Sequence, residues 1–202
     1  LAVDRAGLVG EDGPTHHGVF DVGFLRQVPG MTILCPASHS ELEKMLRWAV
    51  LKCNAPVAVR YPRGSQGGYQ SSAFACDPRG VCVHREGSEV TLITYGNLIN
   101  NVLSAADMLL EKGVSVKVLR LLSVTHIPEL SGLVSGEIVV VEEAAEGSGI
   151  KEAVAWELKG KAVHGIDLGA DFVPHGDQNS LYHLTGLDAG SITNFVCEVL
   201  AQ

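Results

Sequence analysis

The chain has 202 residues, of which 46% are hydrophobic and 5% aromatic, a composition typical of an α/β protein with a sizeable core. Its formal net charge of -8 argues against a general nucleic-acid surface, because such surfaces need clustered Lys and Arg to neutralise phosphates. No apolar run approaches the roughly 18 residues that a membrane span needs. We therefore expect neither nucleic acid nor a membrane as a partner.

The cysteine usage argues against both a zinc site and a disulfide framework. Five cysteines are scattered along the chain, never in the CxxC spacing, at Cys35, Cys53, Cys76, Cys82 and Cys197. An odd number of scattered cysteines supports no regular pairing or tetrahedral ligand set. This usage indicates a reduced, cytosol-like compartment.

The first part of the chain predicts a strand–helix–strand unit. Residues 31–35 form an apolar segment that we interpret as a strand, and residues 56–61 form a second one. Between them, apolar positions in residues 41–53 recur at i, i+3, i+4 and i+7, which predicts an amphipathic helix. Ser38 or Ser40 is expected to be its N-cap. Two parallel strands joined in this way cross over right-handed.

A change of composition predicts a boundary between two domains. Residues 63–80 are rich in Gly, Ser, Gln and Pro and have no periodicity, as is typical of an interdomain connection. We therefore divide the chain into a first domain at residues 1–62, a linker at 63–80 and a second domain at 81–202.

The alternation of strands and helices restarts after the linker. Strands are expected at residues 81–86, 90–96, 114–121, 137–144 and 161–169. Helices are expected at residues 98–112, 150–158 and 189–201. This order is typical of a doubly wound α/β domain.

The stretch GEDGPTHHG at residues 10–18 concentrates titratable side chains on a glycine-rich backbone. Glycines let a backbone turn sharply and approach a ligand, while Asp12, His16 and His17 offer hydrogen bonding and proton transfer. Because adjacent side chains of an extended chain point to opposite sides, at most one histidine is expected to face a ligand. The stretch lacks the GxGxxG and GxxxxGK patterns, so any phosphate must be held by side chains. A solvated turn capped by Asp12 is the alternative interpretation.

Two arginines are the candidates for holding such a phosphate. Arg5 and Arg63 each follow the carboxyl end of a predicted strand, where open α/β sheets bind ligands. Guanidinium groups bind phosphate in a bidentate manner. At this point, surface arginines paired with nearby acids are an equally good interpretation.

The second domain offers weaker candidates. A glycine turn at residues 147–149 opens a predicted helix and could bind an anion, but Glu142, Glu143 and Glu146 beside it would repel one. We therefore interpret it as a structural turn. His175 is interpreted as a loop histidine with satisfied hydrogen bonds.

Two sequence segments indicate a protein family more specifically than the composition does. DRAGLVGEDGPTHHGVFD at residues 4–21 and VRYPRG at residues 59–64 closely resemble the 1-deoxy-D-xylulose-5-phosphate synthases, thiamine-diphosphate enzymes of the transketolase superfamily. The similarity continues through ITYG, VVVEE and VPHGDQNSLYHLTGLDAGSI and covers essentially the whole chain. Transketolases share GEDGPTH but not the DRAG before it or the HG after it. The resemblance implies the second half of a pyrimidine-binding domain followed by a doubly wound transketolase C-terminal domain.

The resemblance also implies a reaction. These synthases condense decarboxylated pyruvate with D-glyceraldehyde 3-phosphate to give 1-deoxy-D-xylulose 5-phosphate and carbon dioxide. The 1-deoxy-D-xylulose 5-phosphate is a precursor in isoprenoid, thiamine and pyridoxal biosynthesis. Thiamine diphosphate and magnesium are the implied cofactors, and a homodimer in the bacterial cytoplasm or the plastid stroma is the implied assembly. The alternatives are a transketolase, a beta-type subunit of a 2-oxoacid decarboxylase and a non-catalytic dimerisation module.

Site residues follow from the same resemblance. It assigns Arg5 and Arg63 to the phosphate of glyceraldehyde 3-phosphate, and Asp12 to polar groups of this acceptor. It assigns His16 to the thiamine-bound intermediate and to proton transfer, and it gives His17 no role.

The residues that bind the cofactor and the metal are expected outside this sequence. Neither the GDG motif followed by Asn nor the glutamate that protonates the aminopyrimidine ring has a match here. Residues 1–3 also look like the end of a buried strand, which favours a piece of a longer synthase over one subunit of a split enzyme. We therefore expect this chain to be inactive alone.

Overall fold

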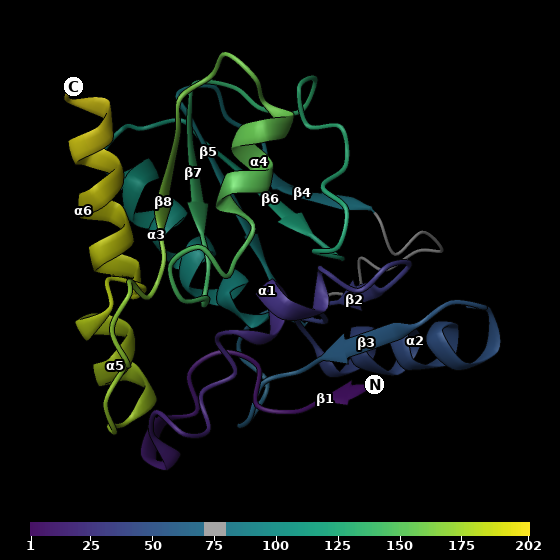
Figure 1. Ribbon diagram of the computed structural model, residues 1–202. Coiled ribbons are helices and arrows are strands. Elements are labelled where there is room, and N and C mark those ends of the chain that lie inside the picture. Colours follow the sequence, from purple (N-terminus) through teal and green to yellow (C-terminus); the bar gives the residue numbers. More distant parts are fainter. Residues whose placement is uncertain (71–79) are drawn as a thin grey trace.

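The structure is a computed structural model that describes residues 1–70 and 80–202 (Figure 1). The predicted linker falls partly outside the described residues, because residues 71–79 are not among them. The described chain contains a three-stranded sheet and a five-stranded sheet, each with helices beside it. The described helices include none that is long and apolar enough to cross a bilayer.

The first sheet is parallel and has the order β1-β3-β2. Its strands and the helices around it are β1 (Ala2–Val3), α1 (Asp21–Leu25), β2 (Thr32–Leu34), α2 (His39–Leu51) and β3 (Val57–Arg60). The predicted strand–helix–strand unit is confirmed as β2, α2 and β3. The five residues of α1 were not predicted, because so short a segment carries no readable period.

The N-cap of α2 is Ser38, one of the two candidates. Its hydroxyl accepts the Glu41 N–H at 3.2 Å, while the Glu41 carboxylate accepts the Ala37 N–H at 2.9 Å. This reciprocal capping resembles a capping box and starts the helix two residues before the predicted position. The helix also ends two residues earlier than predicted, at Leu51.

The second sheet has the order β4-β6-β5-β7-β8, in which β4 alone runs antiparallel to its neighbour. Its strands are β4 (Val81–Arg85), β5 (Val90–Tyr95), β6 (Val116–Leu121), β7 (Glu137–Val141) and β8 (Val163–Ile166). Its helices are α3 (Ile99–Glu111), α4 (Lys151–Glu157), α5 (Gln178–Leu184) and α6 (Ala189–Leu200). Helices α3 and α6 cover one face and α4 the other (Figure 1), so the doubly wound prediction is confirmed.

The two sheets share a hydrophobic core. One buried cluster contains Ile33 of β2 together with Leu119 of β6 and Val154 of α4. The chain after β6 runs beside β2, since the Cys35 N–H donates to the Leu122 carbonyl at 2.9 Å and the Val124 N–H to the Ile33 carbonyl at 3.1 Å. The first domain therefore packs directly on the second, beside the segment that follows β6.

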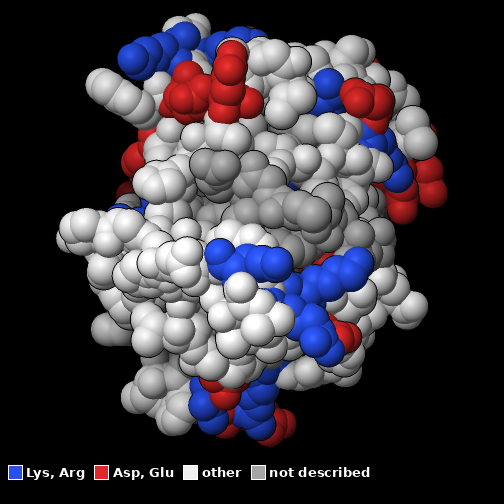
Figure 2. All heavy atoms as spheres, turned by 90° about the vertical axis from the view of Figure 1, so that its right-hand side faces the viewer, with Lys and Arg blue, Asp and Glu red and all other residues white. Residues whose placement is uncertain are grey.

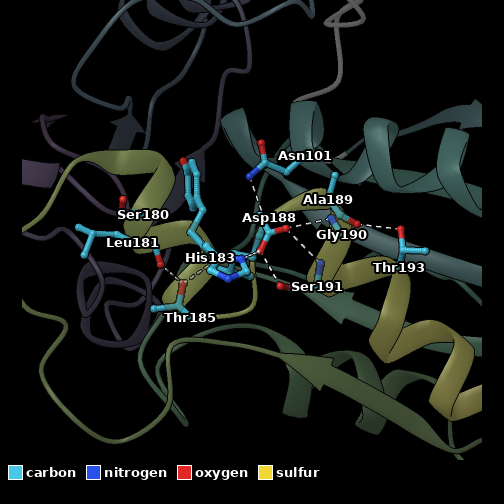
Figure 3. A network of polar contacts seen from close by, with 12 residues as sticks. Asn101, Ser180, Leu181, His183, Thr185, Asp188, Ala189, Gly190, Ser191 and Thr193 are labelled. Atoms are coloured by element: carbon cyan, nitrogen blue, oxygen red, sulfur yellow. Dashed lines mark hydrogen bonds and ion pairs between the residues drawn. The ribbon is translucent and has the colours of Figure 1, made fainter.

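The segment VPHGDQNSLYHLTGLDAGSI forms α5 and the start of α6. Asp188 is the N-cap of α6 and accepts from the Gly190 and Ser191 N–H groups at 3.0 and 3.1 Å (Figure 3). Asn101 of α3 donates to the Leu187 carbonyl at 2.9 Å, which ties α3 to this turn. Helix α5, which the sequence did not predict, is thereby fixed next to the first domain.

The surface charges are mixed. On the face that Figure 2 shows, Lys and Arg form small groups interleaved with Asp and Glu, with uncharged areas between them.

Candidate functional site

The candidate site is built on the loop that follows β1. The Gly7 N–H donates to the Gly18 carbonyl at 2.8 Å, and the Gly18 N–H returns to the Gly7 carbonyl at 2.9 Å, so this pair closes the loop at its base. A Cβ on Gly18 would lie 2.1 Å from the Arg5 carbonyl oxygen, so only glycine permits this approach. Arg5 itself has a left-handed backbone with φ of 62°, which turns the chain out of β1.

Asp12 lies between the two predicted arginines. Its Oδ2 pairs with Nη1 of Arg63 and lies 3.7 Å from Nε of Arg5. The hydrogen bond from Arg63 holds the pKa of Asp12 below its usual value, and Asp12 in turn raises the pKa of Arg63. The guanidinium groups stay open to solvent, with 43% of the Arg5 and 50% of the Arg63 side chain exposed.

The two histidines of the loop diverge, as expected. His16 is exposed, and its Nδ1 lies 2.9 Å from the Thr15 hydroxyl. A charge on His16 would further lower the pKa of Asp12, which places the imidazole within electrostatic reach of that carboxylate. The structure therefore brings together all four predicted site residues, Arg5, Asp12, His16 and Arg63.

His17 faces inward and holds the loop. Its ring is buried, Nδ1 accepts the Val9 N–H at 3.0 Å, and Nε2 lies 3.4 Å from the Pro174 carbonyl. Because a backbone N–H can only donate, Nδ1 is unprotonated and the proton sits on Nε2. The sequence contained no signal for this role, since Pro174 is 157 residues away.

Arg60 supports the end of the loop and was missed by sequence reasoning. The buried guanidinium donates from Nε to Asp21 Oδ2 at 2.7 Å and from Nη2 to the Gly18 carbonyl at 2.6 Å. It also lies over the Tyr95 ring, 5.8 Å from the centroid. Burial opposes its charge, but the attraction of Asp21 raises the pKa of Arg60. The only signal was an arginine at the end of a buried strand.

Glu142 hydrogen-bonds the backbone at the start of α4, directly after the glycine turn. Its carboxylate accepts the Ile150 N–H at 2.7 Å and the Lys151 N–H at 3.1 Å, and it also accepts the Tyr95 hydroxyl at 3.1 Å. Burial raises the pKa of Glu142. The backbone N–H groups of Ile150 and Lys151 are therefore already hydrogen-bonded within the chain.

His175 faces the first domain. A Cβ on Gly13 would lie 2.4 Å from Cδ2 of His175, so the imidazole lies directly against the loop. Beside it, a hollow of about 260 Å³ is lined by Arg63, Glu11, Asp177 and their neighbours. Solvent and small solutes therefore reach the Arg63 guanidinium from this side.

Metal-ligating side chains do not gather in the part of the chain that the structure describes. Among those residues, no group of three or more His, Cys, Asp or Glu side chains could hold a metal ion. The four described cysteines are free thiols, and burial raises the pKa of Cys35 to about 12.

Comparison with known families gives two matches that together span most of the chain. Residues 1–67 match the family described as "Transketolase, pyrimidine binding domain". Residues 80–192 match the family described as "Transketolase, C-terminal domain". Both matches agree with the order of domains in the structure.

The curated relatives include 1-deoxy-D-xylulose-5-phosphate synthases. The protein from Chlorobium phaeovibrioides is 40% identical over 203 residues, which cover 95% of this chain and 32% of that protein. The protein from Gloeobacter violaceus is 36% identical over 213 residues, which cover 100% of this chain and 33% of that protein. The chain thus spans about a third of the length of these relatives.

Solved structures with the same fold include transketolases. One is described as a split gene transketolase in an inactive beta4 tetramer; it has a TM-score of 0.85 and 25% identity, covering 99% of this chain and 66% of that chain. The transketolase of Campylobacter jejuni has a TM-score of 0.80 and 22% identity, covering 98% of this chain and 31% of that chain. The second likeness concerns the fold alone.

Proposed function

The chain belongs to the transketolase family, and on that premise we propose that it supplies the acceptor-binding part of a 1-deoxy-D-xylulose-5-phosphate synthase. Because it spans about a third of its curated relatives, the remaining two thirds must come from the same polypeptide or from a partner subunit. The complete enzyme would join decarboxylated pyruvate to D-glyceraldehyde 3-phosphate and release carbon dioxide.

One observation carries this proposal: a single carboxylate, that of Asp12, pairs with both Arg5 and Arg63. The three residues come from two separate strand ends and the loop, yet their charged groups meet. Two guanidinium groups aimed at one anion are the arrangement that binds phosphate in a bidentate manner. The acceptor phosphate would bind here by competing with Asp12 for the same N–H groups.

The local charge explains why that competition matters. Arg5 and Arg63 contribute two positive charges, whereas Asp4, Glu11 and Asp12 contribute three negative ones, so the formal local sum is -1. A phosphate dianion therefore binds well only when Asp12 releases the guanidinium groups. The released carboxylate is then free to accept a hydrogen bond from a hydroxyl of the acceptor. The pairing of the arginines with nearby acids is thus compatible with phosphate binding.

His16 is the residue that we assign to proton transfer. When the acceptor's aldehyde carbon forms the new carbon–carbon bond, its oxygen takes up a proton. Nε2 of His16 has no hydrogen-bond partner among the described residues, and the ring is exposed beside Asp12. An imidazolium next to a carboxylate of lowered pKa can deliver that proton.

We assign the cofactors to the rest of the enzyme. The described residues hold no cluster of metal-ligating side chains, so we assign magnesium to residues outside this chain. Thiamine diphosphate, when bound, supplies the activated two-carbon fragment from pyruvate. The described residues of this chain bind and orient the acceptor.

The test is steady-state kinetics of the synthase that contains this chain, with Arg63→Ala as the variant. A lost charge-assisted hydrogen bond weakens binding by about tenfold, so the KM for glyceraldehyde 3-phosphate should rise by about that factor. The KM for pyruvate should stay the same. Arg47→Ala is the matched control, because Arg47 is an exposed arginine whose one ion pair among the described residues is with Glu43 on α2. An effect confined to pyruvate would refute the phosphate assignment.

Substrate tests separate the alternatives. Turnover of ribose 5-phosphate as the acceptor would favour a transketolase. Binding of thiamine diphosphate without release of carbon dioxide from pyruvate would favour a non-catalytic dimerisation module. We further propose that the 202-residue chain alone is inactive, in line with the description of its structural relative as an inactive tetramer. Turnover by the purified chain would overturn that proposal.

A further inference from the structure

We propose that Glu143 is a positioning residue for the loop at residues 7–18: its buried carboxylate, together with Gln178, fixes the peptide groups of Leu8 and thereby holds Asp12 and His16 in place. The kinetic consequence rests on the proposed function. The structural consequence does not, because the mobility of the loop can be measured without any turnover.

The second domain holds both polar peptide groups of Leu8. Glu143 lies two residues after the end of β7. Its Oε1 accepts the Leu8 N–H at 3.0 Å, although the two residues are 135 positions apart in the sequence. On the other side of the same residue, Nε2 of Gln178 donates to the Leu8 carbonyl at 3.1 Å. Leu8 is fully buried and lies four residues before Asp12. Two side chains of the second domain thus fix the loop just before its charged part.

Tyr182 joins these two side chains into one unit. Nε2 of Gln178 also donates to the Tyr182 hydroxyl at 3.1 Å, and that hydroxyl hydrogen-bonds the Glu143 carboxylate. Gln178 and Tyr182 are four residues apart on α5, so they share one face of the helix. The carboxylate therefore has a fixed orientation under the loop.

The loop backbone lies directly on this carboxylate. A Cβ on Gly7 would lie 2.5 Å from Oε1 of Glu143, and the φ of Gly7 is 77°. Any other residue at this position would displace the acid or the loop. The same loop meets the second domain again at Gly13, against His175. The loop is therefore shaped by the second domain at more than one point.

A carboxylate is a costly choice for a purely structural contact. Burial raises the pKa of Glu143, and no Lys or Arg among the described residues lies within 4.0 Å of it to form an ion pair. A residue of similar volume without a charge would avoid the desolvation penalty. What the acid provides is a strong acceptor for the Leu8 N–H, with Tyr182 as a second partner of the same carboxylate. We therefore attribute the presence of an acid at this position to its hydrogen bond with the loop backbone, which restricts the motion of the loop.

The neighbouring Glu142 is a natural control. It is also a buried glutamate with a raised pKa, but its hydrogen bonds go to α4 and to Tyr95 and none reaches the loop. Replacing either acid by leucine leaves buried donors without an acceptor and destabilises the second domain. Only the change at Glu143 removes a contact to the loop.

The experiment is hydrogen–deuterium exchange on the synthase that contains this chain, followed by kinetics on the same samples. Glu143→Leu should speed amide exchange in residues 7–18 by about tenfold, the effect of one lost charge-assisted hydrogen bond. Glu143→Gln keeps one acceptor oxygen and should restore most of the protection. Glu142→Leu should leave exchange in the loop unchanged. In the kinetics, Glu143→Leu should raise the KM for glyceraldehyde 3-phosphate while the KM for pyruvate stays the same.

Two results would overturn the inference: unchanged loop exchange in Glu143→Leu, or equal acceleration in Glu142→Leu. If Glu143→Leu does not fold, Gln178→Leu decides instead, because it frees the Leu8 carbonyl from a less buried position. Faster loop exchange in that variant supports the inference, and unchanged exchange overturns it. A wild-type enzyme that lacks synthase activity would refute the proposed function alone, since the exchange data would still decide the role of Glu143.

Discussion

The ion pair between Arg120 and Glu41 should dominate the stability of the contact between the two domains. Both side chains have 0% exposure. Arg120 of β6 donates to Glu41 Oε1 at 2.5 Å and to Oε2 at 3.1 Å, so the contact is bidentate. It also donates to the Tyr69 hydroxyl and to His84 Nε2, each at 3.2 Å. We expect Arg120→Met to remove the bidentate contact from the buried Glu41 carboxylate.

The magnitude follows from that burial. Removing one partner of a buried pair costs about 3 to 5 kcal/mol, because the other charge is left without compensation. In a protein of this size, about 1 kcal/mol lowers the melting temperature by roughly 2 to 4 °C. The variant should therefore melt about 6 to 20 °C below the wild type. Arg85→Met is the control, since the pair of Arg85 with Asp107 lies at the surface and contributes about 0 to 1 kcal/mol.

Urea denaturation followed by circular dichroism measures both variants and the double variant Arg120→Met/Glu41→Gln. The second change removes the buried negative charge, so the double variant should lose about 2 kcal/mol less than the sum of the single variants. A loss below about 1 kcal/mol for Arg120→Met would contradict the reasoning. Strict additivity in the double variant would contradict it as well.

Two further predictions concern protons and phosphate. Burial and the charge of Arg120 lower the pKa of His84 from 6.5 to about 4. Between these two pH values His84 is therefore protonated in the unfolded chain and neutral in the folded chain. The free energy of unfolding should therefore fall as the pH drops from 6.5 towards 4, by up to about 1 kcal/mol per pH unit for this partly exposed ring. His84→Gln should reduce this dependence of the unfolding free energy on pH. Equal pH dependence of the wild type and the variant, measured by urea denaturation at several pH values, would contradict the prediction. At the candidate site, Asp12→Asn removes the carboxylate that competes for Arg5 and Arg63, so inorganic phosphate should bind about two- to fivefold more tightly in a calorimetric titration. Weaker binding would mean that Asp12 aligns the guanidinium groups rather than competing for them.

The sequence predicted the regular elements because their signals are local. The apolar period of α2 and the continuous apolar run of β5 are visible within a single window of residues. Helix α1 escaped prediction because its five residues carry too little of a period. Helix α5 was not predicted either, although α4 has the same length of seven residues and was predicted.

The candidate site divides in the same way. Arg5 and Arg63 could be predicted because ligand sites lie beyond strand ends, a rule that needs only the order of elements. Arg60 could not, since its partner Asp21 lies 39 residues away and nothing local distinguishes it from Arg63. His17 and Glu143 were missed for the same reason, as their contacts to Pro174 and Leu8 span 157 and 135 residues.

The loop at residues 7–18 depends on both domains for its conformation. The residues that we assign to the acceptor lie on a loop whose base is closed within the first domain, between Gly7 and Gly18. The interior of the loop is held by the second domain, through Glu143 and Gln178. A change deep in the second domain can therefore alter acceptor binding without touching a charged residue of the site. Loss of activity in a second-domain variant is then no evidence for a catalytic group there, unless the order of the loop is measured as well.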